Sequence, residues 1–202
     1  FVAIDAPVKF CLLRVRNVSG RPRRLSATAY VEWVLGDLRG KCALHVASEI
    51  DAQSGALCAR NAYHPEFPGR VAFLDSDDAQ RSLTADRAEF IGRNGTLADP
   101  AALKRSRLSG KVGAGFDPCA ALQVRFELAD GQERELVFRL GAAPDGEEAA
   151  RLALRSRGVA AAKAALREVQ VHWQKLLGAV RVRSPAAAVD VLANGWLLYQ
   201  TL

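Results

Sequence analysis

The sequence predicts a mainly β fold, an antiparallel β-sandwich, that is followed by two linker helices and the first helix of a further unit. Within residues 122–128 apolar and polar residues alternate, as in a strand with one buried face. Asp130-Gly131 then makes a turn, and the return strand 134–140 places Leu136, Phe138 and Leu140 inward. After Gly141 the apolar spacing becomes helical. Strands joined by short turns, without alternating helices, favour a sandwich over a parallel sheet.

Five earlier segments carry further strand signals, because they are rich in apolar and β-branched residues and are bounded by turn residues. These predicted strands span residues 8–18, 25–35, 42–50, 56–63 and 71–74. A long connection, residues 75–116, interrupts the series. A connection of this length inside a compact unit is usually functional or forms a structured excursion.

Two amphipathic helices are predicted after the strands. The first begins at Asp145 or Gly146, runs to about Arg157 and ends at Gly158. The second spans residues 159–177 and closes at Gly178, the C-terminal position that glycine favours.

A third helix is predicted over residues 184–202, with Ser184 as its cap and Pro185 in its first turn. Its apolar face needs to be buried against other helices, which we expect from a following part of the protein. The predicted units are therefore a sandwich over 1–144, a helical linker over 145–181, and the start of another helical unit over 182–202.

Composition limits the function classes. The chain has 202 residues, half of them hydrophobic, and a formal net charge of +6. Its apolar runs are far shorter than the ~20 residues of a membrane helix. The basic residues are scattered and are not interleaved with aromatic residues, so we predict no nucleic-acid partner.

The cysteines do not predict a metal site. Cys11, Cys42, Cys58 and Cys119 form no CxxC pair, and no second pair completes the spacing of Cys42 with His45. Each lies in or beside an apolar strand-like run. We expect buried, reduced thiols and a reducing, cytoplasmic compartment.

The best candidate for a binding site lies in residues 86–96 of the long connection. We predict Arg87, Glu89, Arg93 and Asn94 as substrate-binding residues, because they surround an apolar Phe90-Ile91 pair that would anchor the loop. The alternative is a structural loop whose charges pair among themselves. The carboxylates of residues 75–78 are predicted to lie in a solvated turn.

Three stretches, residues 86–103, 115–124 and 176–202, resemble the inverting glycoside phosphorylases of glycoside hydrolase family 94 (glycosyltransferase 36), which include cellobiose phosphorylase. The resemblance is strongest to the branch of cyclic β-1,2-glucan synthases. It implies a large sandwich with strands upstream of Phe1, a two-helix linker, and an (α/α)6 barrel that carries the catalytic acid. That barrel is almost wholly absent here, so no catalytic residue is assigned and the chain alone should be inactive.

The resemblance implies further expectations. The parent would be an inverting glycosyltransferase or phosphorylase acting on a β-glucan oligosaccharide, with inorganic phosphate as co-substrate of a phosphorylase and no cofactor or metal. The expected partners are the rest of the parent chain and, as an open alternative, a second copy in a homodimer. A synthase parent would place this region on the cytoplasmic side of an inner-membrane protein. The other function class is an autonomous carbohydrate-binding module, but the apolar last helix argues against a free-standing module.

Overall fold

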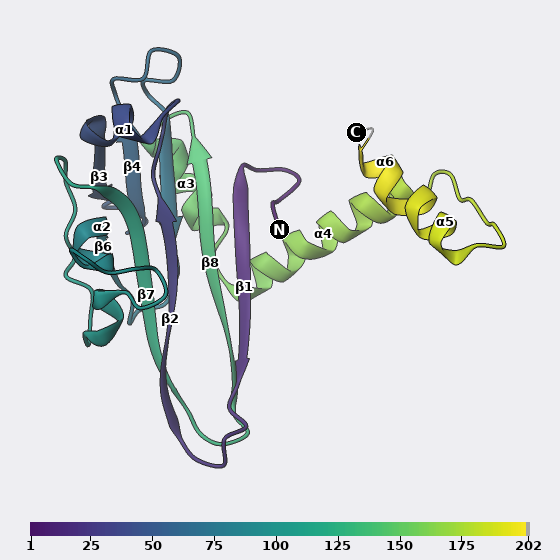
Figure 1. Ribbon diagram of the computed structural model, residues 1–202, viewed down its shortest axis with the longest axis horizontal. Helices are drawn as coiled ribbons and strands as arrows, with labels where there is room; N and C mark the ends of the chain where they lie inside the picture. Colours follow the sequence, from purple (N-terminus) through teal and green to yellow (C-terminus); the bar gives the residue numbers. More distant parts are fainter. Residues whose placement is uncertain (201–202) are drawn as a thin grey trace.

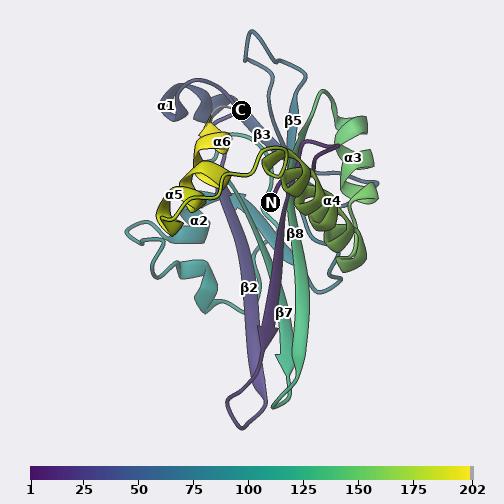
Figure 2. The same ribbon diagram turned by 90° about the vertical axis from the view of Figure 1, so that its right-hand side faces the viewer.

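A computed structural model describes residues 1–200 of the chain (Figures 1 and 2). Its strands form two antiparallel sheets, ordered β1-β8-β5-β4-β3 (sheet A) and β2-β7-β6 (sheet B). The strands are β1 Val8–Arg16, β2 Arg23–Glu32, β3 Val46–Ile50, β4 Leu57–Asn61, β5 Val71–Asp75, β6 Ser82–Asp86, β7 Pro118–Leu128 and β8 Glu133–Ala143. The predicted antiparallel sandwich is confirmed.

Short helices lie between the strands, and longer helices follow them. They are α1 Arg39–Cys42, η1 Ala43–His45, α2 Arg87–Ile91, η2 Ala101–Lys104, α3 Gly146–Arg155, α4 Val159–Leu177, α5 Ala187–Val191, the π-helical η3 Leu192–Trp196 and α6 Leu197–Gln200. Asp145 starts α3, because its carboxylate accepts a hydrogen bond from the Glu148 amide at 2.8 Å.

The main core lies between the two sheets. The alternating residues of β7, Leu122, Val124, Phe126 and Leu128, all point into it and are buried. Gln123 was predicted to face water but is buried as well. Gln123 is buried because the long connection that carries α2 and η2 (the excursion, within residues 75–116) covers the outer face of β7. A small second core lies there.

A third core lies on the outer face of sheet A, where α3 and the first turns of α4 cover β5 and β8. Figure 2 shows both helices on this side of the sheet. Phe73 is fully buried here, and its ring packs directly over Gly141. A Cβ on Gly141 would lie 2.4 Å from the Phe73 ring, so this position in β8 requires glycine.

Two strand predictions need correction. The predicted strand 42–50 begins only at Val46, because residues 39–45 form the helical turns α1 and η1. Strand β6 was not predicted at all. Its five residues, Ser82–Asp86, alternate polar and apolar, but the segment is short and has only Leu83 and Ala85 as apolar residues, so the signal is weak. All five residues are buried, because both faces of the strand are covered.

The C-terminal helices stand away from the sandwich (Figure 1). Along α4 only Ala162 is buried. The predicted final helix starts at Ala187 instead of Ser184, because the Ser184 amide donates to Asp190 Oδ1 at 2.8 Å and its hydroxyl accepts from the Ala186 amide. Thr201 and Leu202, the end of this predicted helix, lie outside the described residues. No helix within residues 1–200 is long and apolar enough to cross a membrane.

Candidate functional site

The predicted binding loop is anchored to the outer face of sheet B. Asp86 caps α2 by accepting a hydrogen bond from the Ala88 amide at 3.0 Å. Phe90 and Ile91 are buried, and the Phe90 ring stacks on Tyr30 with centroids 4.8 Å apart. Gly95 lies so close to the Ile91 carbonyl that a Cβ would fall 2.0 Å from the oxygen. The turn after α2 therefore has one tightly fixed backbone path.

Arg87 is committed to an ion-pair cluster at the edge of this face. Its guanidinium contacts Glu32 at 2.7 Å and Asp117 at 3.2 Å, and Arg39 pairs with the same two carboxylates. The hydrogen bond to Glu32 is the main reason that the pKa of Arg87 is raised further above its ordinary value. This cluster joins β2, α1, α2 and the start of β7.

Glu89 braces the other side of the excursion. Its carboxylate accepts hydrogen bonds from Thr84 Oγ1 at 3.0 Å, Ser109 Oγ at 2.6 Å and Arg105 Nη1 at 3.1 Å. These bonds tie α2 to β6 and to the segment that follows η2. Glu89 is thus held by protein groups on several sides.

Arg93 and Asn94 are different. Both are exposed in the turn after α2, and neither side chain makes a hydrogen bond or ion pair with any described residue. The four predicted residues therefore divide into two pairs. Arg87 and Glu89 hold the excursion in place in separate networks, whereas Arg93 and Asn94 present free donors and acceptors at its surface.

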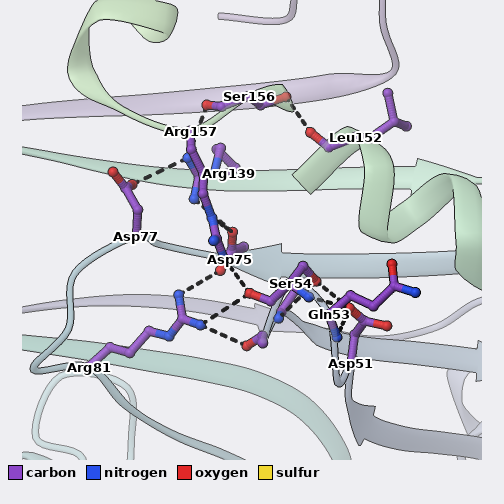
Figure 3. Close-up of polar contacts among 12 residues, drawn as sticks. Asp51, Gln53, Ser54, Asp75, Asp77, Arg81, Arg139, Leu152, Ser156 and Arg157 are labelled. Atoms are coloured by element: carbon purple, nitrogen blue, oxygen red, sulfur yellow. Dashed lines mark hydrogen bonds and ion pairs between the residues drawn. The ribbon is translucent and has the colours of Figure 1, made fainter. Parts of the chain in front are cut away.

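The sequence interpretation missed a buried ion-pair cluster at Asp75 (Figure 3). Residues 75–78 were predicted to form a solvated turn, but the Asp75 side chain is fully buried. Its carboxylate contacts Arg139 Nη2 at 2.7 Å and Arg81 Nη1 at 2.8 Å. Asp77 is exposed as predicted, although it also pairs with Arg139 Nη1 at 3.3 Å. The prediction fails for Asp75 because α3 packs against β5.

Arg139 connects this cluster to the linker helices. It is fully buried in β8 and donates through Nη1 to the Ser156 carbonyl at 3.0 Å, just past the end of α3. Arg157, the next residue, donates to the Ser54 carbonyl and lies 3.9 Å from Asp75. Arg139 lies at an outward position of an alternating strand, where the sequence alone indicates exposure. It is buried because a helix covers this face of the sheet. Because both carboxylate oxygens of Asp75 accept from guanidinium groups, the cluster is a structural one.

One of the four cysteines corrects a further expectation. Cys42, Cys58 and Cys119 are buried and free, but Cys11 in β1 is exposed and free. Burial raises the pKa of Cys58 and of Cys119 to about 12. Among the tryptophans, Trp33 is buried in the core, whereas Trp196 is 60% exposed. Within residues 1–200, no three His, Cys, Asp or Glu side chains are placed to hold a metal ion.

Comparison with known proteins agrees with this architecture. The sequence model of the glycosyl hydrolase 94 supersandwich domain matches residues 1–159, which include every strand and α3. The chain is 38% identical over 197 residues to the cyclic beta-(1,2)-glucan synthase NdvB of Rhizobium meliloti (strain 1021). That match covers 97% of this chain and 7% of the synthase.

Two phosphorylases are more distant relatives. The N,N'-diacetylchitobiose phosphorylase of Vibrio proteolyticus is 25% identical, and the cellobionic acid phosphorylase of Neurospora crassa is 28% identical. Each match covers 92% of this chain and 24% of the phosphorylase. The chain thus spans a quarter or less of each of these relatives, and by its fold and sequence it belongs to the glycosyl hydrolase 94 family, whose supersandwich domain it contains.

Proposed function

We propose that this chain is the non-catalytic sandwich and linker region of a carbohydrate-active enzyme, in which it helps to shape the substrate groove and supports the catalytic barrel. The relatives that it resembles are named as a glucan synthase and as phosphorylases, and the chain corresponds to only 7% to 24% of their lengths. The chemistry of inversion, with one carboxylic acid and an attacking phosphate, would be supplied by the remainder of such an enzyme.

The observation that carries the groove-shaping role is the pair of free side chains at Arg93 and Asn94. They stand on a turn whose backbone is fixed by buried Phe90 and Ile91, and whose base is braced by the ion pairs of Arg87 and Glu89. Exposed polar groups on a rigid base bind a ligand without a large loss of conformational entropy. Arginine and asparagine offer the donors and acceptors that sugar hydroxyls and phosphate require.

The proposed ligand is a β-linked glucan oligosaccharide, with β-1,2 linkages favoured by the named synthase relative. The proposed partner of the C-terminal helices is the catalytic barrel of the same protein. Val191, Trp196, Leu197 and Tyr199 are each more than half exposed, which suits a surface that another part of the protein covers. A cytoplasmic location, as part of an inner-membrane protein, and pairing into a homodimer belong to the same proposal.

Titration of the chain with linear β-1,2-gluco-oligosaccharides, followed by backbone amide shifts, tests the proposal. We expect shifts confined to residues 86–96 and their loss in the variant R93A/N94A. In the enzyme that contains this chain, the same variant should raise KM by about tenfold if each side chain contributes one hydrogen bond to the bound glucan.

Lys104→Ala is the matched control, because Lys104 is an exposed cation of the same excursion that is already paired with Asp99 at 2.6 Å. An unchanged KM and kcat in R93A/N94A would refute the role of the loop. Strong binding by the chain alone, at residues other than 86–96, would favour an autonomous carbohydrate-binding module instead.

A further inference from the structure

On one side of the sandwich, β7 and β8 extend beyond their neighbouring strands β6 and β5. Strand β6 pairs with β7 only as far as Gln123, and β5 pairs with β8 only from Arg139 onward. Residues 124–128 of β7 therefore have a neighbouring strand, β2, on one side only. A groove of about 650 Å³ runs along this free edge.

Four arginines from separate segments converge on the groove: Arg24 of β2, Arg107 after η2, Arg125 of β7 and Arg134 of β8. Arg24 is paired with Glu127 at 2.8 Å, and Arg134 with Asp78. The four cations face these two carboxylates, so an excess of positive charge remains in the groove.

Arg107 and Arg125 supply that excess. Both are exposed, and neither makes a side-chain hydrogen bond or ion pair with a described residue. Most other cations of the sandwich, by contrast, have carboxylate partners, as at Arg87, Arg139 and Lys111. The floor of the groove also contains Phe126, and the Arg134 guanidinium lies over its ring at 5.3 Å. This contact orients Arg134 at the groove wall.

We propose that this groove binds a phosphate-type oxyanion, held by Arg107 and Arg125. A guanidinium group presents paired donors that match two oxygens of a phosphate, and it keeps its charge at every physiological pH. Arg24 and Arg134 line the same groove but share their charge with carboxylates. The anion is either free inorganic phosphate or the phosphate group of a sugar phosphate whose ring would extend toward the other groove-lining residues, such as Ala79 and Gln80. This site lies outside residues 86–96 and goes beyond the proposed glucan contact.

Titration of the chain with inorganic phosphate at constant ionic strength, monitored at the arginine Nε–H signals, tests the site. We expect saturable shifts at Arg107 and Arg125 and a dissociation constant in the millimolar range. The double variant R107Q/R125Q should weaken binding at least about tenfold, since each lost guanidinium removes charge-assisted hydrogen bonds.

The matched control is R16Q/R167Q, which removes the same charge from two exposed arginines outside the groove. Equal weakening in both variants, or shifts that do not saturate, would overturn the proposal, because either result indicates unspecific attraction to a basic surface. A second titration with glucose 1-phosphate separates the two sources. Tighter binding with added shifts at Ala79 and Gln80 would identify a sugar phosphate, whereas equal or weaker binding would identify inorganic phosphate.

Discussion

The sandwich and the C-terminal helices are built from similar apolar residues but use them in opposite ways. The sandwich has one core between the sheets and one on the outer face of each sheet. Even the charged residues Arg139 and Asp75 are fully buried. In α5, η3 and α6 no described residue is buried, and large apolar side chains face outward. An apolar helical pattern in the sequence therefore does not by itself show that a segment is buried.

This difference matters for how the two regions acquire stability. The Asp75 cluster ties β5, β8 and the α3–α4 junction together through buried charge (Figure 3). Beyond Ala162 the helices receive little support from the sandwich. Changes in the first region should alter the unfolding free energy, whereas changes in the second should alter association.

The largest effect is expected for Asp75→Asn. The substitution keeps the shape of the side chain but removes the buried carboxylate charge that Arg139 contacts, and leaves Arg139 only the partly exposed Asp77 at 3.3 Å. Unfolding should therefore become easier by about 3 kcal/mol. Chemical denaturation measures this change. Asp5→Asn is the control, because Asp5 pairs with Arg155 at the surface at 3.5 Å and should cost less than about 1 kcal/mol. Equal effects of the two variants would contradict the contrast between buried and exposed charge.

A smaller effect is expected from pH. The folded state raises the pKa of Cys58 and Cys119 from the ordinary value near 9 to about 12, because burial disfavours the thiolate. Above pH 9 the unfolded chain loses these protons while the folded chain keeps them, so stability falls as pH rises from 9 toward 12. At pH 10 the loss should be about 1.4 kcal/mol per thiol.

Denaturation curves at pH 8 and pH 10 measure this loss, and the variant C58A/C119A provides the comparison. Its stability should change less between the two pH values than that of the parent, by about 2.7 kcal/mol in total for the two thiols. Equal slopes would mean that the buried thiols do not control the alkaline loss. The exposed Cys11 should meanwhile react with thiol reagents in the folded protein.

The smallest effect on sandwich stability is expected for W196S/L197S. Both side chains are more than half exposed and outside the three cores, so the unfolding free energy should change by less than about 0.5 kcal/mol. The same variant should reduce self-association in sedimentation experiments. Leu44→Ser, at a residue of η1 that is 76% exposed, is the control and should leave association unchanged. A large loss of sandwich stability in W196S/L197S would show that the last helices contribute to the fold.

Much of the candidate site was accessible from sequence because it depends on local chemistry. The apolar Phe90-Ile91 pair between charged residues predicted an anchored loop, and both residues are buried. The sequence did not predict which charged residues of the loop are paired and which are free. Arg87 and Arg93 have similar surroundings in the sequence. Arg87 is paired because the fold brings Glu32 and Asp117 next to it from distant segments, whereas Arg93 stays free.

The sequence by itself determined the elements whose signals are local: the β7–β8 hairpin from its alternation and Asp-Gly turn, and α3 and α4 from their apolar faces and glycine ends. Only the tertiary structure decided the features that depend on what covers a surface. Gln123 and Arg139 occupy outward positions of regular strands and are buried because a loop and a helix close over them. Strand alternation records which face a side chain takes, but it carries no information about whether a second layer will pack on that face.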